Sequence, residues 1–351
     1  MRFIPLMVLT LCCFSIHSVN AEQLFKVKID DGSSQAKGFA MVDTITDKNR
    51  IVEVDRKGKV IWQAKLPSSI NTKRICSASG IKHDQVRDIF TFIIPGQGAF
   101  EVNREGDFNK LFDDENISHD LDLLENGNFL YTRGFVNKGT ASVIERNASG
   151  KIVWEWDPAD HITNKDYKRS MKGIPISKKK KKKLLKNMEA GKDWAHVNGA
   201  DRLPNGDTLI SIRNIHRAVV VSPDGKIKDT IRDIAMIHEP HLMAGGIISA
   251  DRAGNAKTKK PNMSMIFIKD GKTSKILEGK YLTVRGIEVL DENRFGFNSA
   301  NHVVEADLSG KVYFDMHLKQ AKPNGEANGK RQINSRCGKG PGTLYKIART
   351  Y

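Results

Sequence analysis

Short segments of alternating apolar and polar residues fill most of the chain, and a similar glycine turn interrupts them six times. The turn glycines are Gly58, Gly106, Gly150, Gly225, Gly271 and Gly310, and Lys follows five of the six. The intervals are 48, 44, 75, 46 and 39 residues, and the long interval shortens to 43 when a 32-residue basic insertion at 161–192 is removed. A nearly constant period of this length indicates a repeat architecture.

A second turn lies upstream of the glycine turn in several units. Asn126-Gly127 occurs within LDLLENGNFLYTR, and Asn205-Gly206 within ADRLPNGDTLISIR. Asn-Gly favours a two-residue hairpin because both residues tolerate positive φ, and the alternating flanks predict half-buried strands. Two hairpins per unit give four strands, which is the composition of a propeller blade. We therefore predict an all-β fold in which residues 22–351 form a single β-propeller of about six four-stranded blades.

The repeat also predicts local details. The glycine-lysine turn becomes the outer hairpin of each blade, so Trp62, Trp154 and Trp156 on the following strand are expected to pack between blades. A strand at 24–29 or one at 343–348 is expected to close the ring. Leu184, Leu185 and Met188 have helical spacing, which predicts a helix over 178–190. A pair of β-sandwiches is the alternative architecture, but sandwiches do not repeat with this period.

The N-terminus has the features of a secretory signal peptide. Arg2 precedes a short apolar segment at 4–14, and Val19-Asn20-Ala21 supplies the small residues of a cleavage site. We predict that residues 1–21 are removed and that the protein is periplasmic or secreted. Of four cysteines, Cys76 and Cys337 then remain. They either form a disulfide or stay as two buried thiols.

Positive charge is concentrated in one place. The formal net charge is +16, and residues 161–192 contain 12 Lys or Arg against two acidic residues. Such a run is typical of a solvated loop, and its functional interpretation is attraction of a polyanion or an anionic surface by Lys178–Lys183. No aromatic residues lie among these lysines, so nucleic acid is not an expected partner. No feature of the sequence points to an oligomeric state.

Three histidines occur at a similar position in separate units. His119, His196 and His241 each come at the start of a blade, and Arg285 has the corresponding place in the last unit. Because the innermost strands of a propeller line its channel, these side chains are expected to converge at one mouth. His238 lies three residues before His241, and the pattern assigns it no role. Five further histidines occur at other positions and are expected to be structural, namely His83, His161, His216, His302 and His317.

One segment resembles a known family. DWAHVNGADRLPNGDTLISIRN, from Asp193 to Asn214, is similar to the central motif of the bacterial arylsulfotransferase family, with His196, Asn198 and Arg213 as its most specific part. SHDLDLLENGNFLYTR and IHEPHLMAGG resemble neighbouring blades, and RGIEVLDENRFGFNSANHVVEADLSGKV and KGFAMVDTITDKNRIVEVDRKGKVIW resemble the last and first blades. The resemblance covers most of the chain beyond the signal peptide.

The resemblance implies an exported six-bladed enzyme. Such an enzyme transfers a sulfuryl group from an aryl sulfate donor to a phenolic acceptor through a transiently sulfated histidine, without a nucleotide donor, cofactor or metal. It assigns His241 as the nucleophile, with His196, Arg213 and His119 as further catalytic residues. The substrate contacts are expected from Asn198, Arg285 and His238. Neutral imidazole is nucleophilic near pH 7, and a guanidinium can stabilise charge on the sulfuryl oxygens.

Two alternatives remain at this stage. One is a non-catalytic propeller that binds an anionic or sulfated ligand. The other is a metal-dependent lyase or hydrolase in which His119, His196 and His241 are the ligands. Arg213 argues against the second alternative, because a nearby guanidinium would repel a metal cation.

Overall fold

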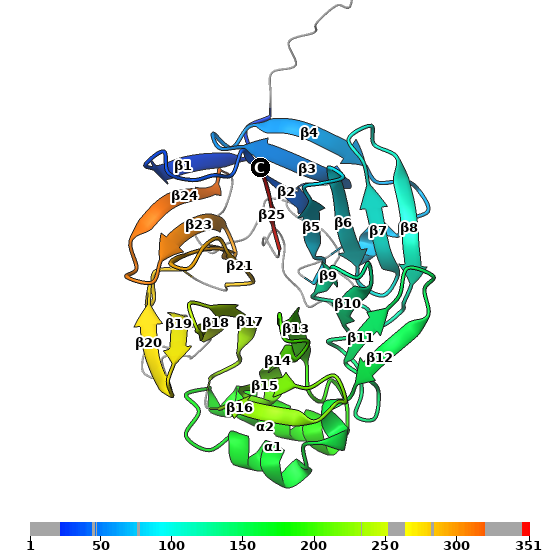
Figure 1. The fold of residues 1–351 in the computed structure, drawn as a ribbon, viewed down its shortest axis with the longest axis vertical. Coiled ribbons are helices and arrows are strands. Elements are labelled where there is room, and N and C mark those ends of the chain that lie inside the picture. Colours follow the sequence, from blue (N-terminus) through cyan, green and yellow to red (C-terminus); the bar gives the residue numbers. More distant parts are fainter. Residues whose placement is uncertain are drawn as a thin grey trace, which may run out of the picture.

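The six sequence repeats become six antiparallel sheets arranged around a central channel in the computed structural model of the protein (Figure 1). The structure describes residues 22–43, 46, 48–75, 78–232, 234–251, 264–281, 284–319 and 346–351. The predicted signal peptide lies outside these residues, and so do Cys76 and Cys337, for which the sequence left a disulfide and two thiols as alternatives. The prediction of an all-β propeller with six blades is confirmed.

The blades follow one another along the chain. Blades 1 to 3 consist of β25 (Ala348–Thr350), β2 (Gly38–Val42), β3 (Arg50–Asp55) and β4 (Val60–Lys65); of β5 (Ile81–Asp84), β6 (Ile89–Ile94), β7 (Gly98–Val102) and β8 (Phe108–Asp113); and of β9 (Leu121–Leu123), β10 (Phe129–Thr132), β11 (Val143–Arg146) and β12 (Ile152–Trp156).

Blades 4 to 6 continue the same order from the channel outward. They consist of β13 (Val197–Arg202), β14 (Thr208–Ile212), β15 (Arg217–Val221) and β16 (Ile227–Ile231); of β17 (His238–Met243), β18 (Gly246–Asp251), β19 (Ser264–Lys269) and β20 (Lys272–Ile276); and of β21 (Gly286–Val289), β22 (Arg294–Asn298), β23 (His302–Asp307), β24 (Val312–Leu318) and β1 (Phe25–Asp30).

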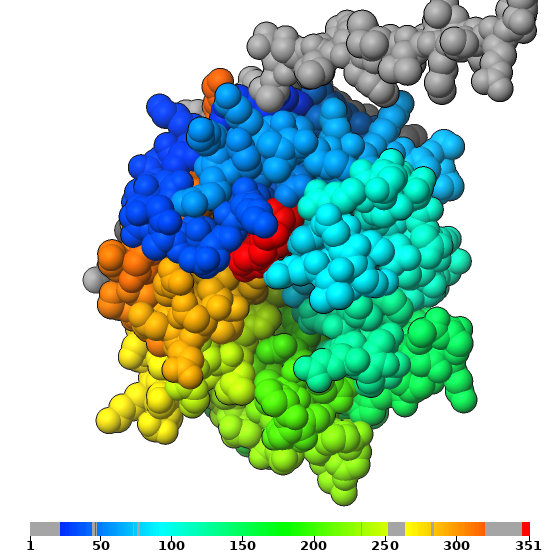
Figure 2. Space-filling view, turned by 45° about the horizontal axis from the view of Figure 1, so that its top comes forward, coloured from blue at the N-terminus to red at the C-terminus, as the bar shows by residue number. Residues whose placement is uncertain are grey.

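Both ends of the described chain close the ring. β25 is the innermost strand of blade 1, where it pairs with β2, and β1 is an additional outermost strand of blade 6, where it pairs with β24. Figure 2 shows the C-terminal residues, coloured red, at the surface between blades 1 and 2. The sequence offered a strand at 24–29 or one at 343–348. The first is present as β1, and the C-terminal strand lies at 348–350, so it shares only Ala348 with the expected segment.

The hydrophobic core is divided among the blade interfaces. Among the described residues, six buried clusters are found, and each joins the facing sides of two neighbouring blades. Trp62 Nε1 donates to the carbonyl of Arg104, 2.8 Å away in the outer turn of the next blade, and Trp156 donates to Gly225 at 3.1 Å. These contacts confirm the predicted packing of the outer tryptophans between blades.

The basic insertion is ordered as helices. It contains α1 (Asn164–Ser170) and α2 (Lys178–Glu189). In the described ranges, 3₁₀ turns occur at Thr72–Arg74, Pro158–Asp160 and Arg213–Ile215. Leu184 and Met188 of α2 are buried in the same cluster as Val197 and Ile212 of blade 4. The predicted helix is therefore present, and the solvated loop expected for this lysine run is instead a cover packed on blade 4. Within the described ranges, no helix is both long and apolar enough to cross a membrane.

Candidate active site

His119 and His196 lie in contact at the start of their blades. Their ring centroids are 5.0 Å apart, and the ring of Phe135 packs 4.7 Å from the first and 5.0 Å from the second. Both histidines are buried, and both have positive φ, 76° at His119 and 52° at His196. Left-handed backbone is unfavourable for residues with a Cβ and is concentrated at functional sites. The two predicted histidines thus meet across blades 3 and 4.

The backbone around His119 leaves no space for a larger residue. A Cβ at Gly134 would lie 2.4 Å from His119 Nδ1. The Ser118 hydroxyl accepts a hydrogen bond from Gly134 N and lies 2.9 Å from His119 Nδ1, so it links the two residues. Glycine is required at 134 because the imidazole occupies the place of its side chain.

Several positively charged side chains lie near His119. Burial, followed by the charges of His196, Arg213, Arg285 and Lys346, holds the pKa of His119 well below its usual value. His119 is therefore neutral at pH 7. Arg213 and Arg285, both expected from the sequence to belong to the site, are close enough to bear on its charge, which makes this mouth of the channel suitable for an anion.

His196 forms a pair with a carboxylate. Its Nδ1 lies 2.6 Å from Asp193 Oδ1, and burial raises the pKa of Asp193 to about 6 even though Arg213, Lys180 and Lys183 oppose the rise. At neutral pH the carboxylate is charged and can only accept, so the proton of this hydrogen bond is on Nδ1. His196 Nε2 is then the basic atom. Asp193 is the first residue of the segment that resembles the family motif, but the motif gave it no role.

His238 has a defined tautomer. Its Nδ1 is 2.5 Å from the carbonyl oxygen of Met236, which accepts only, so Nδ1 is protonated. The lone pair on Nε2 accepts from Arg285 Nη1 at 3.0 Å. The repeat pattern gave His238 no role, and the sequence expectation was a substrate contact. The structure brings its Nε2 against the arginine of blade 6.

His241 lies in a different environment, three residues further along β17. Its Nδ1 is 3.3 Å from Asp201 Oδ2. Burial opposes protonation, but Asp201 and Glu239 outweigh it and raise the pKa of His241. A register shift separates His238 from His241 in the pairing of β17 with β18. His238 lies before this bulge and His241 after it. His238 therefore has the position at the start of its blade that His119 and His196 have in theirs.

Asn198 is occupied by protein contacts. It is fully buried, its Oδ1 accepts from Ser211 Oγ at 2.6 Å, and its Nδ2 donates to the carbonyl of Ile237 at 3.4 Å. These bonds connect β13 to the residue before His238. The position of Asn198 therefore indicates that it holds blade 5 against blade 4, next to the histidines.

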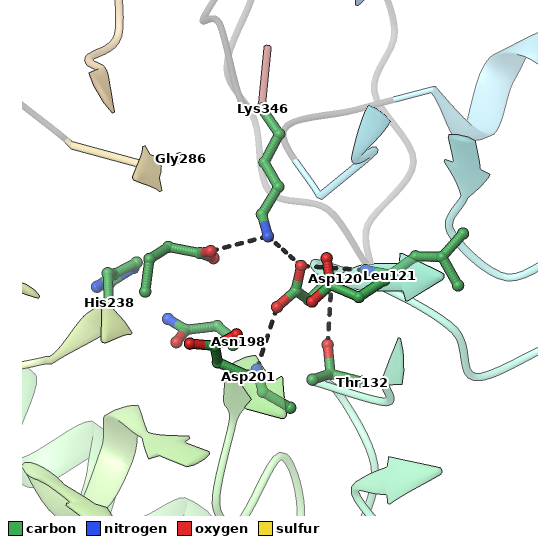
Figure 3. A network of polar contacts seen from close by, with 12 residues as sticks. Asp120, Leu121, Thr132, Asn198, Asp201, His238, Gly286 and Lys346 are labelled. Carbon is green, nitrogen blue, oxygen red and sulfur yellow. Dashed lines mark hydrogen bonds and ion pairs between the residues drawn. The ribbon is translucent and has the colours of Figure 1, made fainter. Parts of the chain in front are cut away.

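A charged network fills the channel beside the histidines (Figure 3). Lys346 Nζ lies 2.8 Å from Glu239 Oε2 and also contacts Asp120, whose other oxygen accepts from Ala200 N at 3.1 Å. Burial raises the pKa of Glu239 to about 7, while Lys346 and Lys82 outweigh burial and lower that of Asp120 to about 2. Sequence reasoning missed this network because its members come from blades 1, 3 and 5.

Among the residues that the structure describes, no group of three or more His, Cys, Asp or Glu has an arrangement that could hold a metal ion. The neighbours of the site histidines are an aromatic ring, hydroxyl, carbonyl and guanidinium groups, and single carboxylates, namely those of Phe135, Ser118, Met236, Arg285, Asp193 and Asp201.

Fold and site together define a β-propeller whose channel mouth combines neutral histidines with arginines. Residues 26–232, more than half of the chain, match the sequence model of the family described as arylsulfotransferase (ASST). The chain belongs to this arylsulfotransferase family, as the sequence resemblance implied. No curated protein matches the sequence significantly.

One solved structure with a TM-score above 0.5 supports the fold. A protein of unknown function from Bacteroides caccae has a TM-score of 0.53 at 13% identity, covering 90% of this chain and 99% of its own. A streptogramin B lyase has a TM-score of 0.47 at 12% identity, with coverages of 85% and 89%, and virginiamycin B lyase from Staphylococcus aureus has 0.42 at 13%, with 71% and 72%. At 13% identity the similarity to the Bacteroides caccae protein concerns the fold alone.

Proposed function

We propose that this protein transfers a sulfuryl group from an aryl sulfate ester to a phenolic acceptor through a sulfated histidine. The observation that carries the proposal is His238, a neutral imidazole whose Nε2 lone pair faces Arg285 beside the other site histidines. Family membership gives the general reaction class, and the residue roles rest on the geometry.

In the first half of the reaction, His238 Nε2 attacks the sulfur of the donor. An N–S bond forms as the S–O bond to the aryl group breaks. His196 enters this half-reaction as the imidazolium, with a second proton on Nε2, and gives that proton to the departing phenolate to become neutral. Arg285 and Arg213 stabilise the negative charge on the sulfuryl oxygens. The hydrogen bond that His238 Nδ1–H donates to the Met236 carbonyl stabilises the positive charge that the ring acquires.

The second half reverses these steps with a different phenol. His196 Nε2 removes the acceptor proton, the phenolic oxygen attacks sulfur, and the N–S bond breaks to regenerate neutral His238. His196 suits this role because Asp193 fixes its tautomer and stabilises the imidazolium form. Neutral His119 completes the wall of the site, and Asn198 positions the segment that leads to His238.

The proposal is tested by incubating the protein with 4-nitrophenyl sulfate and phenol, with and without a chelator. We expect phenol-dependent release of 4-nitrophenol that the chelator does not reduce. Saturable binding of the donor without turnover would favour the non-catalytic alternative, and loss of turnover on chelation would favour the metal-dependent one. Either result would contradict the proposed reaction.

Replacement of Asp193 by asparagine is expected to lower kcat by roughly a hundredfold or more, because His196 loses the partner that keeps its proton on Nδ1. In the unmodified protein, kcat is expected to fall as the pH decreases through about 6, where Asp193 becomes protonated. The measurement is a pH–rate profile from pH 4.5 to 8, which extends to both sides of the decline expected near pH 6.

Asp160→Asn is the matched control for this profile, because Asp160 is an exposed carboxylate of the segment that leads into the insertion. It is expected to leave both kcat and its acid limb unchanged. An acid limb near pH 6 that persists in Asp193→Asn would show that another group controls the decline.

We also propose that the protein is exported after cleavage behind Ala21. The support is the sequence of residues 1–21, and the expected result is a periplasmic or secreted protein whose N-terminus is Glu22. N-terminal sequencing of the mature protein tests this, and an N-terminus that still includes the apolar segment at 4–14 would contradict it.

A further inference from the structure

A cavity lies outside the channel, beside the basic insertion. It has a volume of about 230 Å³ and is lined by Arg169 and Ser170 of α1, by Ile215, His216 and Arg217 between β14 and β15, and by Arg232 after β16. One water occupies about 30 Å³ and drug-sized ligands need about 300–1,000 Å³, so the volume suits a small ion or the head group of a ligand.

The lining of this cavity is strongly positive. Three of its six residues are arginines, and none is acidic. Arg169 has a long ion pair, with Nη1 3.7 Å from Asp166 Oδ1, and its side chain is 65% exposed. Like charges that converge in this way repel one another unless an anion lies between them, and guanidinium groups bind oxyanions with paired hydrogen bonds.

His216 presents a buried donor to the same cavity. Its Nδ1 accepts a hydrogen bond from Met236 N at 3.0 Å, so the ring proton is on Nε2. Within the described part of the chain, Nε2 has no hydrogen-bond partner although His216 is 1% exposed. Burial, helped by Arg213, Lys180 and Arg217, lowers the pKa of His216 to about 4, which keeps the ring neutral. Buried donors normally have acceptors, so this one points to a ligand.

The backbone holds His216 in place. Its φ is 57°, in the left-handed region, and its carbonyl accepts from Ile234 N at 3.3 Å. Left-handed conformation at a non-glycine residue is maintained only where the surroundings determine it. His216 is therefore a preorganised donor and not a mobile surface residue.

We propose that this cavity is a binding site for a sulfate-type oxyanion, either free or as the head group of a sulfate ester. His216 Nε2–H donates to one oxygen, and Arg169, Arg217 and Arg232 surround the others. The site is separate from the proposed nucleophile, and binding to it requires no turnover, so it does not depend on the proposed reaction.

The test is a calorimetric titration of the full-length mature protein with sodium sulfate at constant ionic strength, since salt screens exposed charges. Arg169→Gln and Arg232→Gln are each expected to weaken sulfate binding by about tenfold, which corresponds to one charge-assisted hydrogen bond. Arg87→Gln is the matched control, because Arg87 is 46% exposed and pairs with Asp84 at the end of β5. It is expected to bind sulfate as tightly as the unmodified protein.

Two further titrations distinguish a site for ester head groups from one for the free ion, and the cavity from the channel. Methyl sulfate is titrated in parallel: binding of both compounds with the same arginine dependence supports a site for ester head groups, and binding of sulfate alone supports a site for the free ion. Arg285→Gln removes a cation from the channel and leaves the cavity intact. Sulfate binding that survives Arg169→Gln and Arg232→Gln but is lost in Arg285→Gln would overturn the proposal.

Discussion

Replacing His238 with glutamine is expected to abolish sulfuryl transfer, with a loss in kcat of about a thousandfold or more, as is typical when a nucleophile is removed. Glutamine can still hydrogen-bond to its neighbours but has no nucleophilic lone pair. The measurements are release of 4-nitrophenol and intact mass spectrometry of protein quenched during turnover. The unmodified protein is expected to gain the mass of one sulfuryl group, and His238→Gln is expected to gain none.

His241→Gln is the decisive comparison. It removes an imidazole from the same strand, but one that is paired with Asp201 and more readily protonated, and a protonated imidazole is a poor nucleophile. We expect the loss in kcat to remain within about tenfold. If His241→Gln abolishes the sulfated species while His238→Gln retains it, the nucleophile is His241, as the sequence resemblance implied.

Replacing Lys346 with methionine is expected to destabilise the protein by about 3–5 kcal/mol, the usual cost of leaving buried charges without their partner. Lys346 precedes β25 of blade 1, and its ammonium group bridges Asp120 of blade 3 and Glu239 of blade 5. Without it, two buried carboxylates face each other. The measurement is the free energy of unfolding from urea titration.

Lys110→Met is the control for this substitution. Lys110 pairs with Asp113 at the surface, where both side chains are largely exposed, and such pairs contribute at most about 1 kcal/mol. A change in unfolding free energy at Lys346 no larger than the change at Lys110 would contradict a stabilising role for the channel network.

The channel network also affects the site chemistry. Lys346 is among the charges that lower the pKa of His119, and Glu239, which follows His238 directly, has a φ of 47°. The carboxylate that contacts Lys346 is therefore one residue away from the proposed nucleophile. Stability of the ring and placement of the reactive histidine depend on the same group of residues.

Much of the fold follows from local sequence. The six glycine turns all have positive φ and form the outer hairpins between the third and fourth strands, as their spacing indicates. The helix over the lysine run ends one residue earlier than the pattern predicts. These features were predictable because hairpins and helices are determined by neighbouring residues, whose periodicity is visible in a single sequence.

The sequence by itself determined the repeat, the number of blades and the presence of histidines and an arginine at the blade starts. Tertiary structure alone decided that His238 faces Arg285, that His241 turns to Asp201, and that Lys346 joins Asp120 and Glu239. The physical reason is that a bulge in β17 shifts its register after His238, and that the contacts of Lys346 join residues more than 100 positions apart. Their pairing depends on how the blades close into a ring, which no local pattern records.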